Sequence, residues 1–147
     1  MEYLTNTNDN SFSASTLQEA RVNETNFEDS FGKIGKRSFL VFKHNKYLTV
    51  PTENIAFFYI KYTTSLIVSF DRQEFAVNYS LEHIEELLSG LQFYRLNRQY
   101  LINFCAVREV EHYFARKLLV NLTVPVAGKL LVSKERAKSF LQWLENR

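Results

Sequence analysis

The stretch FYRLNRQYLIN, residues 93–103, is the most informative part of this sequence. Phe93 and the apolar run at 100–102 stand at its two ends, so both ends are expected to be anchored in a hydrophobic core. The middle of the stretch contains Asn97 and Arg98 and is too polar for a buried strand. We therefore expect the middle to project from the domain.

The side chains of Asn97 and Arg98 are suited to reading DNA bases. Asparagine can form two hydrogen bonds with adenine, and arginine can do the same with the O6 and N7 atoms of guanine. The alternative for Arg98 is a structural role, either in a salt bridge or as a cap of the preceding helix. The sequence alone leaves both roles open.

The residues on both sides of this stretch predict short β-strands. Aromatic and β-branched residues are frequent, and they favour strands over helices. Tight turns are expected at residues 45–46 and 71–73, because these positions are polar and separate apolar runs. The predicted strands cover residues 39–42, 47–50, 55–60, 66–70, 74–77, 100–102, 107–113, 118–122 and 130–132.

Two helices complete the predicted fold. The first begins at Ser80 and ends near Gly90. The second begins at Ser133, a residue type that often caps helices, and runs to the end of the chain. The sequence therefore predicts a mostly β fold of the α+β class, with one helix after the first strands and one at the C-terminus. The apolar face of the first helix contains Leu81, Ile84, Leu88 and Leu91.

Length and composition fit one soluble globular domain. The 147 residues are 46% hydrophobic, which is enough to build a core. The single cysteine, Cys105, cannot form a disulfide within the chain, as expected for a reducing cytoplasm. The sequence has no signal peptide and no run of about 20 apolar residues, so we expect a cytoplasmic protein without a membrane partner.

Acidic and basic residues are unevenly distributed along the chain. Residues 1–31 carry a net charge of −5, whereas residues 32–147 carry +7. The N-terminal part is also rich in Asn, Ser, Thr and Glu, so residues 1–37 are expected to be a flexible tail or linker with one candidate helix around 15–22. Residues 38–147 are expected to form the folded domain.

The segment from Arg95 to Lys138 has the highest density of positive charge. It would bind a polyanion such as DNA if these side chains faced the same way. No catalytic constellation accompanies them, since the three histidines are far apart and no nucleotide or metal motif occurs, and we expect neither enzyme activity nor a cofactor. Against three acids, the bases in this segment are Arg95, Arg98, Arg108, Arg116, Lys117, Lys129, Lys134, Arg136 and Lys138.

The start of the second helix is a further candidate for contact with a phosphate. Ser133 is followed by Lys134 and Arg136, and cations in the first turn of a helix oppose its dipole. The unpaired amides at such an end bind anions, so the cations indicate a phosphate site. A merely solvated basic turn is the alternative.

Three parts of the sequence together resemble the LytTR family of DNA-binding domains. They are residues 55–60, the helix at 81–88 with the stretch at 93–103, and residues 131–144, and they occur in the family order. The resemblance implies an elongated arrangement of antiparallel sheets that reads double-stranded DNA from loops in successive major grooves. It also implies repeated DNA sites, a homodimer on DNA, and an upstream receiver domain or sensor kinase of a two-component system that these residues do not contain.

The resemblance also assigns roles to individual residues. Glu135 stands where the family commonly has a basic residue, so either Lys134 or Arg136 is expected to take over that contact. The base-reading candidates are Asn97, Arg98, Thr64, Ser65 and Lys134. The phosphate-binding candidates are Lys61, Arg95, Lys129, Ser133 and Arg136.

The leading hypothesis is a bacterial transcriptional regulator that binds specific sequences of duplex DNA. The first alternative is a β-rich sensory or protein-interaction domain that binds a small ligand or a partner protein. A second alternative is binding of single-stranded nucleic acid on exposed aromatic rings. DNA binding predicts an affinity that falls steeply with salt, whereas a ligand pocket predicts stabilisation by a metabolite. Whether the chain stands alone or is a fragment of a longer regulator is left open.

Overall fold

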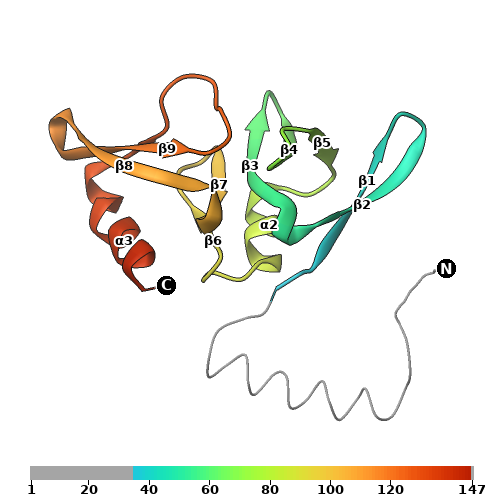
Figure 1. The fold of residues 1–147 in the computed structure, drawn as a ribbon, viewed down its shortest axis with the longest axis horizontal. Helices are drawn as coiled ribbons and strands as arrows, with labels where there is room; N and C mark the ends of the chain where they lie inside the picture. Colours follow the sequence, from blue (N-terminus) through green and yellow to red (C-terminus); the bar gives the residue numbers. More distant parts are fainter. Residues whose placement is uncertain (1–34, 147) are drawn as a thin grey trace, which may run out of the picture. The chain divides into compact units, whose positions relative to one another are not determined.

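The computed structural model describes residues 35–146 of the chain. This part contains ten β-strands, two α-helices and three short 3-10 helices (Figure 1). Of the predicted N-terminal tail at 1–37, residues 1–34, with the candidate helix at 15–22, lie outside the described residues. All paired strands are antiparallel, so the predicted mostly β fold with two helices is confirmed.

A five-stranded sheet forms the middle of the fold (Figure 1). Its strands have the order β5-β4-β3-β7-β6, so β3 is the central strand and β5 and β6 form the edges. The chain leaves the sheet after β5, forms the first helix, and returns to add β6 and β7 on the other side of β3. The strands are β3 (Ile55–Lys61), β4 (Thr64–Ser69), β5 (Glu74–Val77), β6 (Phe93–Arg95) and β7 (Tyr100–Asn103).

Two smaller sheets accompany the five-stranded one. β1 and β2 form a hairpin whose turn residues, His44 and Asn45, are both left-handed, with φ of 53° and 62°. Two consecutive left-handed residues suit the twist of a tight hairpin. β8, β9 and β10 form a three-stranded sheet with β9 in the middle. The strands are β1 (Ser38–Lys43), β2 (Lys46–Pro51), β8 (Val107–Tyr113), β9 (Lys117–Leu122) and β10 (Leu131–Val132).

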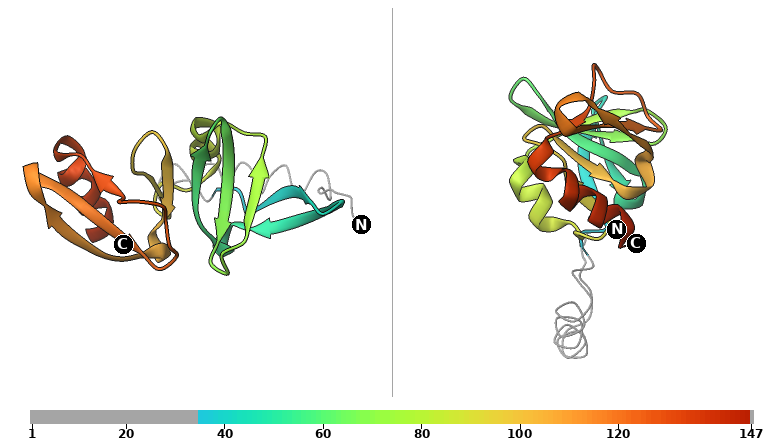
Figure 2. Two further views of the ribbon diagram at one scale, coloured as in Figure 1. Left: turned by 90° about the horizontal axis from the view of Figure 1, so that it is seen from above. Right: turned by 90° about the vertical axis from the view of Figure 1, so that its left-hand side faces the viewer.

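The two α-helices lie against different sheets (Figure 2). α2 starts at its N-cap Ser80 as predicted, and the hydroxyl of Ser80 caps it by accepting a hydrogen bond from the backbone N–H of His83 at 3.1 Å. In α3, the indole Nε1 of Trp143 donates to the carbonyl of Gly90 at 2.8 Å and ties α3 to the segment after α2. The helices are α2 (Leu81–Leu87) and α3 (Lys134–Glu145), and the 3-10 helices are η1 (Thr52–Asn54), η2 (Phe104–Ala106) and η3 (Phe114–Arg116).

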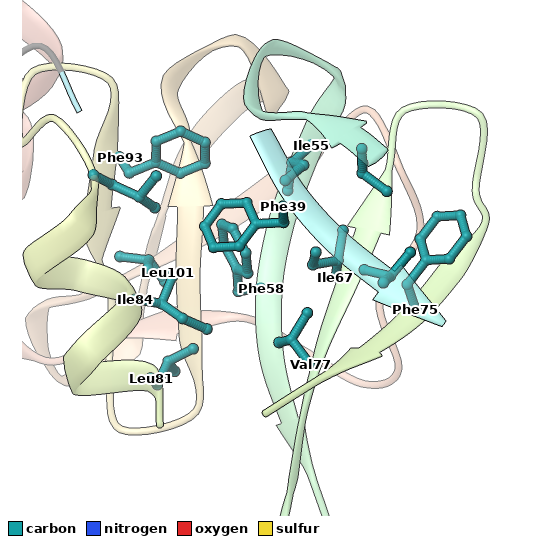
Figure 3. Packing of buried hydrophobic residues seen from close by; sticks show 13 residues of the cluster. Phe39, Ile55, Phe58, Ile67, Phe75, Val77, Leu81, Ile84, Phe93 and Leu101 are labelled. Carbon is teal, nitrogen blue, oxygen red and sulfur yellow. The ribbon is translucent and has the colours of Figure 1, made fainter. Parts of the chain in front are cut away.

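Hydrophobic cores lie on both faces of the five-stranded sheet. The first core joins this sheet to α2 and the β1–β2 hairpin (Figure 3). The second core joins it to the three-stranded sheet and α3. Fully buried members of the first core include Phe39, Ile55, Phe58, Ile67, Leu81, Ile84 and Leu101, and those of the second include Leu96, Ile102, Val132 and Phe140.

The alternation of side chains along β6 and β7 explains how each strand serves both cores. Phe93 belongs to the first core, and the next residue, Tyr94, packs against the second. In β7, Leu101 and Ile102 are divided in the same way. Because successive side chains of a strand point to opposite faces, Arg95 returns to the face that α2 covers.

Most predicted elements are confirmed, and three details are wrong. The β1–β2 turn lies one residue earlier than predicted, because Lys46 already pairs with Lys43. α2 ends at Leu87, so Leu91 lies beyond the helix and is 50% exposed. The residues at 93–95 form strand β6, whereas no strand was predicted in this stretch before Tyr100.

Candidate nucleic-acid interface

The β6–β7 loop, residues 96–99, is held in place by Arg95. The Arg95 side chain is only 14% exposed. Its Nε donates to the carbonyl of Asn97 at 2.8 Å, and one terminal nitrogen donates to the carbonyl of Arg98 at 2.7 Å. One guanidinium group therefore fixes two consecutive peptide units of the loop.

The helix α2 supplies two carboxylates to the same guanidinium. The terminal nitrogens of Arg95 lie 3.8 Å from a carboxylate oxygen of Glu82 and 3.5 Å from one of Glu85. These ion pairs and the two carbonyl contacts use most of the donors of the guanidinium. The geometry therefore favours a positioning role for Arg95 over the expected contact with a phosphate.

Asn97 forms the turn at the centre of the loop. Its side-chain oxygen accepts hydrogen bonds from the backbone N–H groups of Gln99 at 2.8 Å and Tyr100 at 3.0 Å. An amide oxygen has two lone pairs, and the turn uses both. Bidentate pairing with adenine needs this oxygen as an acceptor. While the turn is intact, Asn97 can offer a base only its Nδ2 donor.

Arg98 is presented to solvent by this braced loop. Its side chain is exposed, and among the described residues it forms neither an ion pair nor a hydrogen bond. The salt bridge and the helix cap that were the structural alternatives for Arg98 do not occur in residues 35–146. A free guanidinium on a fixed backbone loses little additional freedom when it binds a partner.

The β3–β4 turn lies beside the β6–β7 loop. Lys61 and Thr64 pair across a two-residue turn, and both are exposed. The backbone N–H of Ile60 donates to the carbonyl of Gln99 at 3.1 Å. Lys61 and Arg98 therefore lie directly beyond the last hydrogen bond between the two segments.

The first turns of α3 are joined to β6, the strand that leads into the β6–β7 loop. A terminal nitrogen of Arg136 donates to the carbonyl of Arg95, and the guanidinium lies 5.4 Å from the centre of the Tyr94 ring. The hydroxyls of Tyr94 and Ser139 are hydrogen-bonded at 3.0 Å. These contacts fix the start of α3 beside β6, where the loop begins. Lys134 is exposed in the same turn of α3 and lies in a groove with Arg116.

Ser133 precedes α3 but does not cap it with its side chain. Its backbone is extended, with φ of −64° and ψ of 157°, yet its hydroxyl accepts no hydrogen bond from the first turn. The expected side-chain cap is therefore absent. The backbone N–H of Arg136 donates to the carbonyl of Ser133 at 3.0 Å. The exposed hydroxyl of Ser133 and the amides of Lys134 and Glu135 remain free to bind an anion.

We call these three segments, residues 61–64, 96–99 and 133–136, the candidate interface. It contains four cationic residues and a single acidic one, Glu135. An excess of this kind suits a negatively charged partner. The four cations are Lys61, Arg98, Lys134 and Arg136.

Two predicted contact residues lie away from the candidate interface. Ser65 is only 6% exposed, so its hydroxyl is not placed to reach a DNA base. Lys129 lies in the loop between β9 and β10, and this loop borders Arg72 in the β4–β5 turn. That turn lies at the opposite end of β4 from Thr64. The structure therefore separates Lys129 from the candidate interface.

The candidate interface also contains Tyr62, which the sequence did not single out. It is 91% exposed and has φ of 59°, a conformation that is unfavourable for bulky residues. An exposed ring held in a strained turn next to Lys61 is a candidate contact residue. The sequence feature that could have indicated this residue is a tyrosine in a polar turn between two apolar strands.

A stacked pair of tyrosines supports the strands that lead into the candidate interface. The rings of Tyr59 and Tyr100 lie 5.6 Å apart and are nearly parallel. Burial raises the pKa of Tyr59 to about 12, and the bond from its hydroxyl to Glu74 adds to this effect. Burial also raises the pKa of Tyr100. Both rings are therefore neutral at physiological pH and act as packing groups.

Within residues 35–146, no group of three or more His, Cys, Asp or Glu side chains is placed to hold a metal ion. Neither of the two described α-helices is both long and apolar enough to cross a bilayer.

Comparison with known proteins identifies the family. The family model of the LytTr DNA-binding domain matches residues 45–145. Among solved structures, a LytTr DNA-binding domain from Bacillus cereus, attributed to a methyl-accepting/DNA response regulator, has a similar fold, with a TM-score of 0.64. It is 19% identical, and the match covers 75% of this chain and 98% of that domain. No curated protein has a matching sequence. Because the family model covers more than half of its length, the chain belongs to the LytTr DNA-binding domain family, and residues 45–145 are its DNA-binding domain.

Proposed function

We propose that this domain recognises specific sequences of duplex DNA by placing the candidate interface in the major groove. The proposal rests mainly on Arg98. Its side chain is exposed and has no partner among the described residues, and it belongs to a loop whose backbone is hydrogen-bonded to the side chains of Arg95 and Asn97. A fixed guanidinium suits the O6 and N7 atoms of guanine, which are exposed in the major groove. Arg98 is therefore the principal base-reading residue of the proposal.

The neighbouring polar groups have complementary roles in this proposal. Lys61 in the β3–β4 turn and Lys134 in the first turn of α3 are exposed cations and bind phosphates of the backbone or base edges. Ser133 and the free amides at the start of α3 bind a phosphate, which the helix dipole favours. Thr64 contributes a hydroxyl beside Lys61. Arg136 shares its charge with the same phosphates while it holds α3 to the loop.

The proposed regulator acts on repeated sites and binds them as a homodimer. A single domain offers a short contact surface, and two copies on adjacent half-sites would add the sequence information that one copy lacks. The Bacillus cereus domain is attributed to a response regulator, which favours control by a receiver domain or sensor kinase. The proposed output is transcription, without catalysis by this domain.

Selection of bound duplexes from a random pool tests this proposal. Purified protein is mixed with the pool at two salt concentrations, and the bound DNA is sequenced. We expect an enriched motif, in the form of a spaced repeat, and an affinity that falls steeply with salt. Recovery of unenriched DNA at both salt concentrations would contradict sequence-specific binding.

A further inference from the structure

A second group of unpaired cations lies in a groove at the far end of the five-stranded sheet. Arg72 from the β4–β5 turn, Arg108 from β8 and Lys129 from the β9–β10 loop all line this groove. All three are exposed. The groove brings together three elements that are far apart in the sequence, and each contributes one positive charge. The fold therefore concentrates positive charge at this place.

None of these three cations has an ion pair within residues 35–146. The nearest acids in the sequence have other partners. Asp71 accepts a hydrogen bond from the hydroxyl of Ser69 and another from the Gln73 side chain at 2.8 Å. Like charges that converge without a counterion repel each other, so a bound anion would stabilise the arrangement.

Within residues 35–146, the acids of β8 form no ion pair with these cations and are hydrogen-bonded to Asn121 instead. Glu109 and Glu111 accept hydrogen bonds from the Nδ2 of Asn121 at 3.2 and 2.5 Å. Asn121 itself lines the groove, so its amide draws both carboxylates toward β9. These two carboxylates would repel an anion bound in the groove, and the three cations would attract it.

The backbone of the groove is shaped by two left-handed residues. Arg72 has φ of 71°, although glycine or asparagine would adopt this conformation at lower cost. Gly128 has φ of 73°, and a Cβ built on it would meet nothing within 4 Å. The β4–β5 turn therefore holds Arg72 in a strained backbone conformation. In the β9–β10 loop, the space beside Gly128 is open.

The loop that faces these arginines has free hydrogen-bond donors. No backbone N–H between residues 126 and 129 donates to another residue in the described part of the chain. Free amides beside guanidinium groups are the donors that bind phosphate oxygens in proteins. The groove therefore offers both the charge and the donors that a phosphate needs.

We propose that this groove is a second site for a phosphate group, distinct from the candidate interface. The phosphate belongs either to the backbone of bound DNA or to a free phosphorylated molecule. The DNA form of this inference rests on the proposed function, whereas the free-anion form does not. Arg72, Arg108 and Lys129 are the ligating side chains in both forms.

Two measurements on the full chain test the groove. In the first, inorganic pyrophosphate is titrated while the amide signals of residues 126–129 are followed by NMR. In the second, the salt dependence of binding to the selected duplex is measured. Both use the double variant R108Q/K129Q and a matched control, R37Q/K46Q, which removes two exposed cations from the β1–β2 region.

A bound phosphate predicts that pyrophosphate shifts the signals of 126–129 in the wild type and in the control but not in R108Q/K129Q. If the phosphate belongs to DNA, the slope of log affinity against log salt flattens by about 0.9 per lost contact, or about 2 in R108Q/K129Q, and stays unchanged in the control. Shifts with pyrophosphate and an unchanged slope identify a free phosphorylated molecule instead.

The proposal is overturned if pyrophosphate leaves these signals in place and R108Q/K129Q has the same salt slope as the control. Folding of each variant is checked by its thermal unfolding, so a loss of structure is not mistaken for a loss of binding. A wild type that prefers no duplex sequence would refute the proposed function. The pyrophosphate titration would still decide whether the groove binds a phosphate.

Discussion

The β6–β7 loop and the β3–β4 turn lie side by side but are stabilised in different ways. The loop at 96–99 is fixed by side chains, since Arg95 binds two of its carbonyls and Asn97 binds two backbone N–H groups. The turn at 61–64 is fixed by its strands, and Tyr62 between them has a 91% exposed ring. Substitutions of the residues that support the loop should therefore lower the free energy of unfolding, whereas substitutions in the turn should change it little.

The largest effect is expected for Arg95→Ala in the loop. The change leaves two loop carbonyls and two carboxylates of α2 without their partner, and hydrogen bonds to charged groups are worth about 1.5–3 kcal/mol each. We expect the free energy of unfolding in urea to fall by roughly 2–3 kcal/mol and DNA binding to be lost with it. An unchanged unfolding curve would show that Arg95 does not support the loop.

A smaller effect is expected for Asn97→Ala. This variant removes the acceptor of two backbone hydrogen bonds, which should cost about 1–2 kcal/mol in urea unfolding. Asn97→Asp keeps an oxygen acceptor at the same position and should restore most of this stability. If both variants lost the same stability, the turn-forming role of the Asn97 oxygen would be wrong.

The smallest effect is expected for Tyr62→Asn in the turn. Asparagine tolerates the left-handed conformation better than tyrosine, and the exposed ring of Tyr62 contributes little packing. The free energy of unfolding should therefore stay within about 0.5 kcal/mol of the wild type. A loss comparable to that of Asn97→Ala would remove the contrast between the two segments.

The arrangement of strands and helices could be predicted because the chain repeats simple local patterns. Alternating apolar residues predicted most strands, and Ser80 predicted the start of α2. In the structure, the Ser80 hydroxyl accepts a hydrogen bond from the first turn of this helix. β6 was missed because Arg95, a charged residue, lies within it. The Arg95 side chain can be buried because it pairs with Glu82 and Glu85 of α2, which only the fold brings next to it.

The location of the site could be predicted better than the roles of its residues. Arg98 is exposed as expected, and the hydrogen bond from Ile60 to Gln99 places its backbone beside that of Lys61, the last residue of β3. The sequence could not show that Arg95, in β6, is held by carboxylates of α2 while Arg98, in the β6–β7 loop, is exposed. It also could not show that Ser65 is buried or that Lys129 lies at the other end of the sheet.

The most direct test of base reading by the braced loop is the binding of Arg98→Ala to two duplexes, one with the selected motif and one with the same bases scrambled. Fluorescence anisotropy gives both affinities, and Arg37→Ala serves as a control for the loss of an exposed arginine. We predict a loss of about 1–3 kcal/mol on the motif, little loss on the scrambled duplex, and an unchanged unfolding curve. Equal losses on both duplexes, or no loss on either, would contradict the role of Arg98.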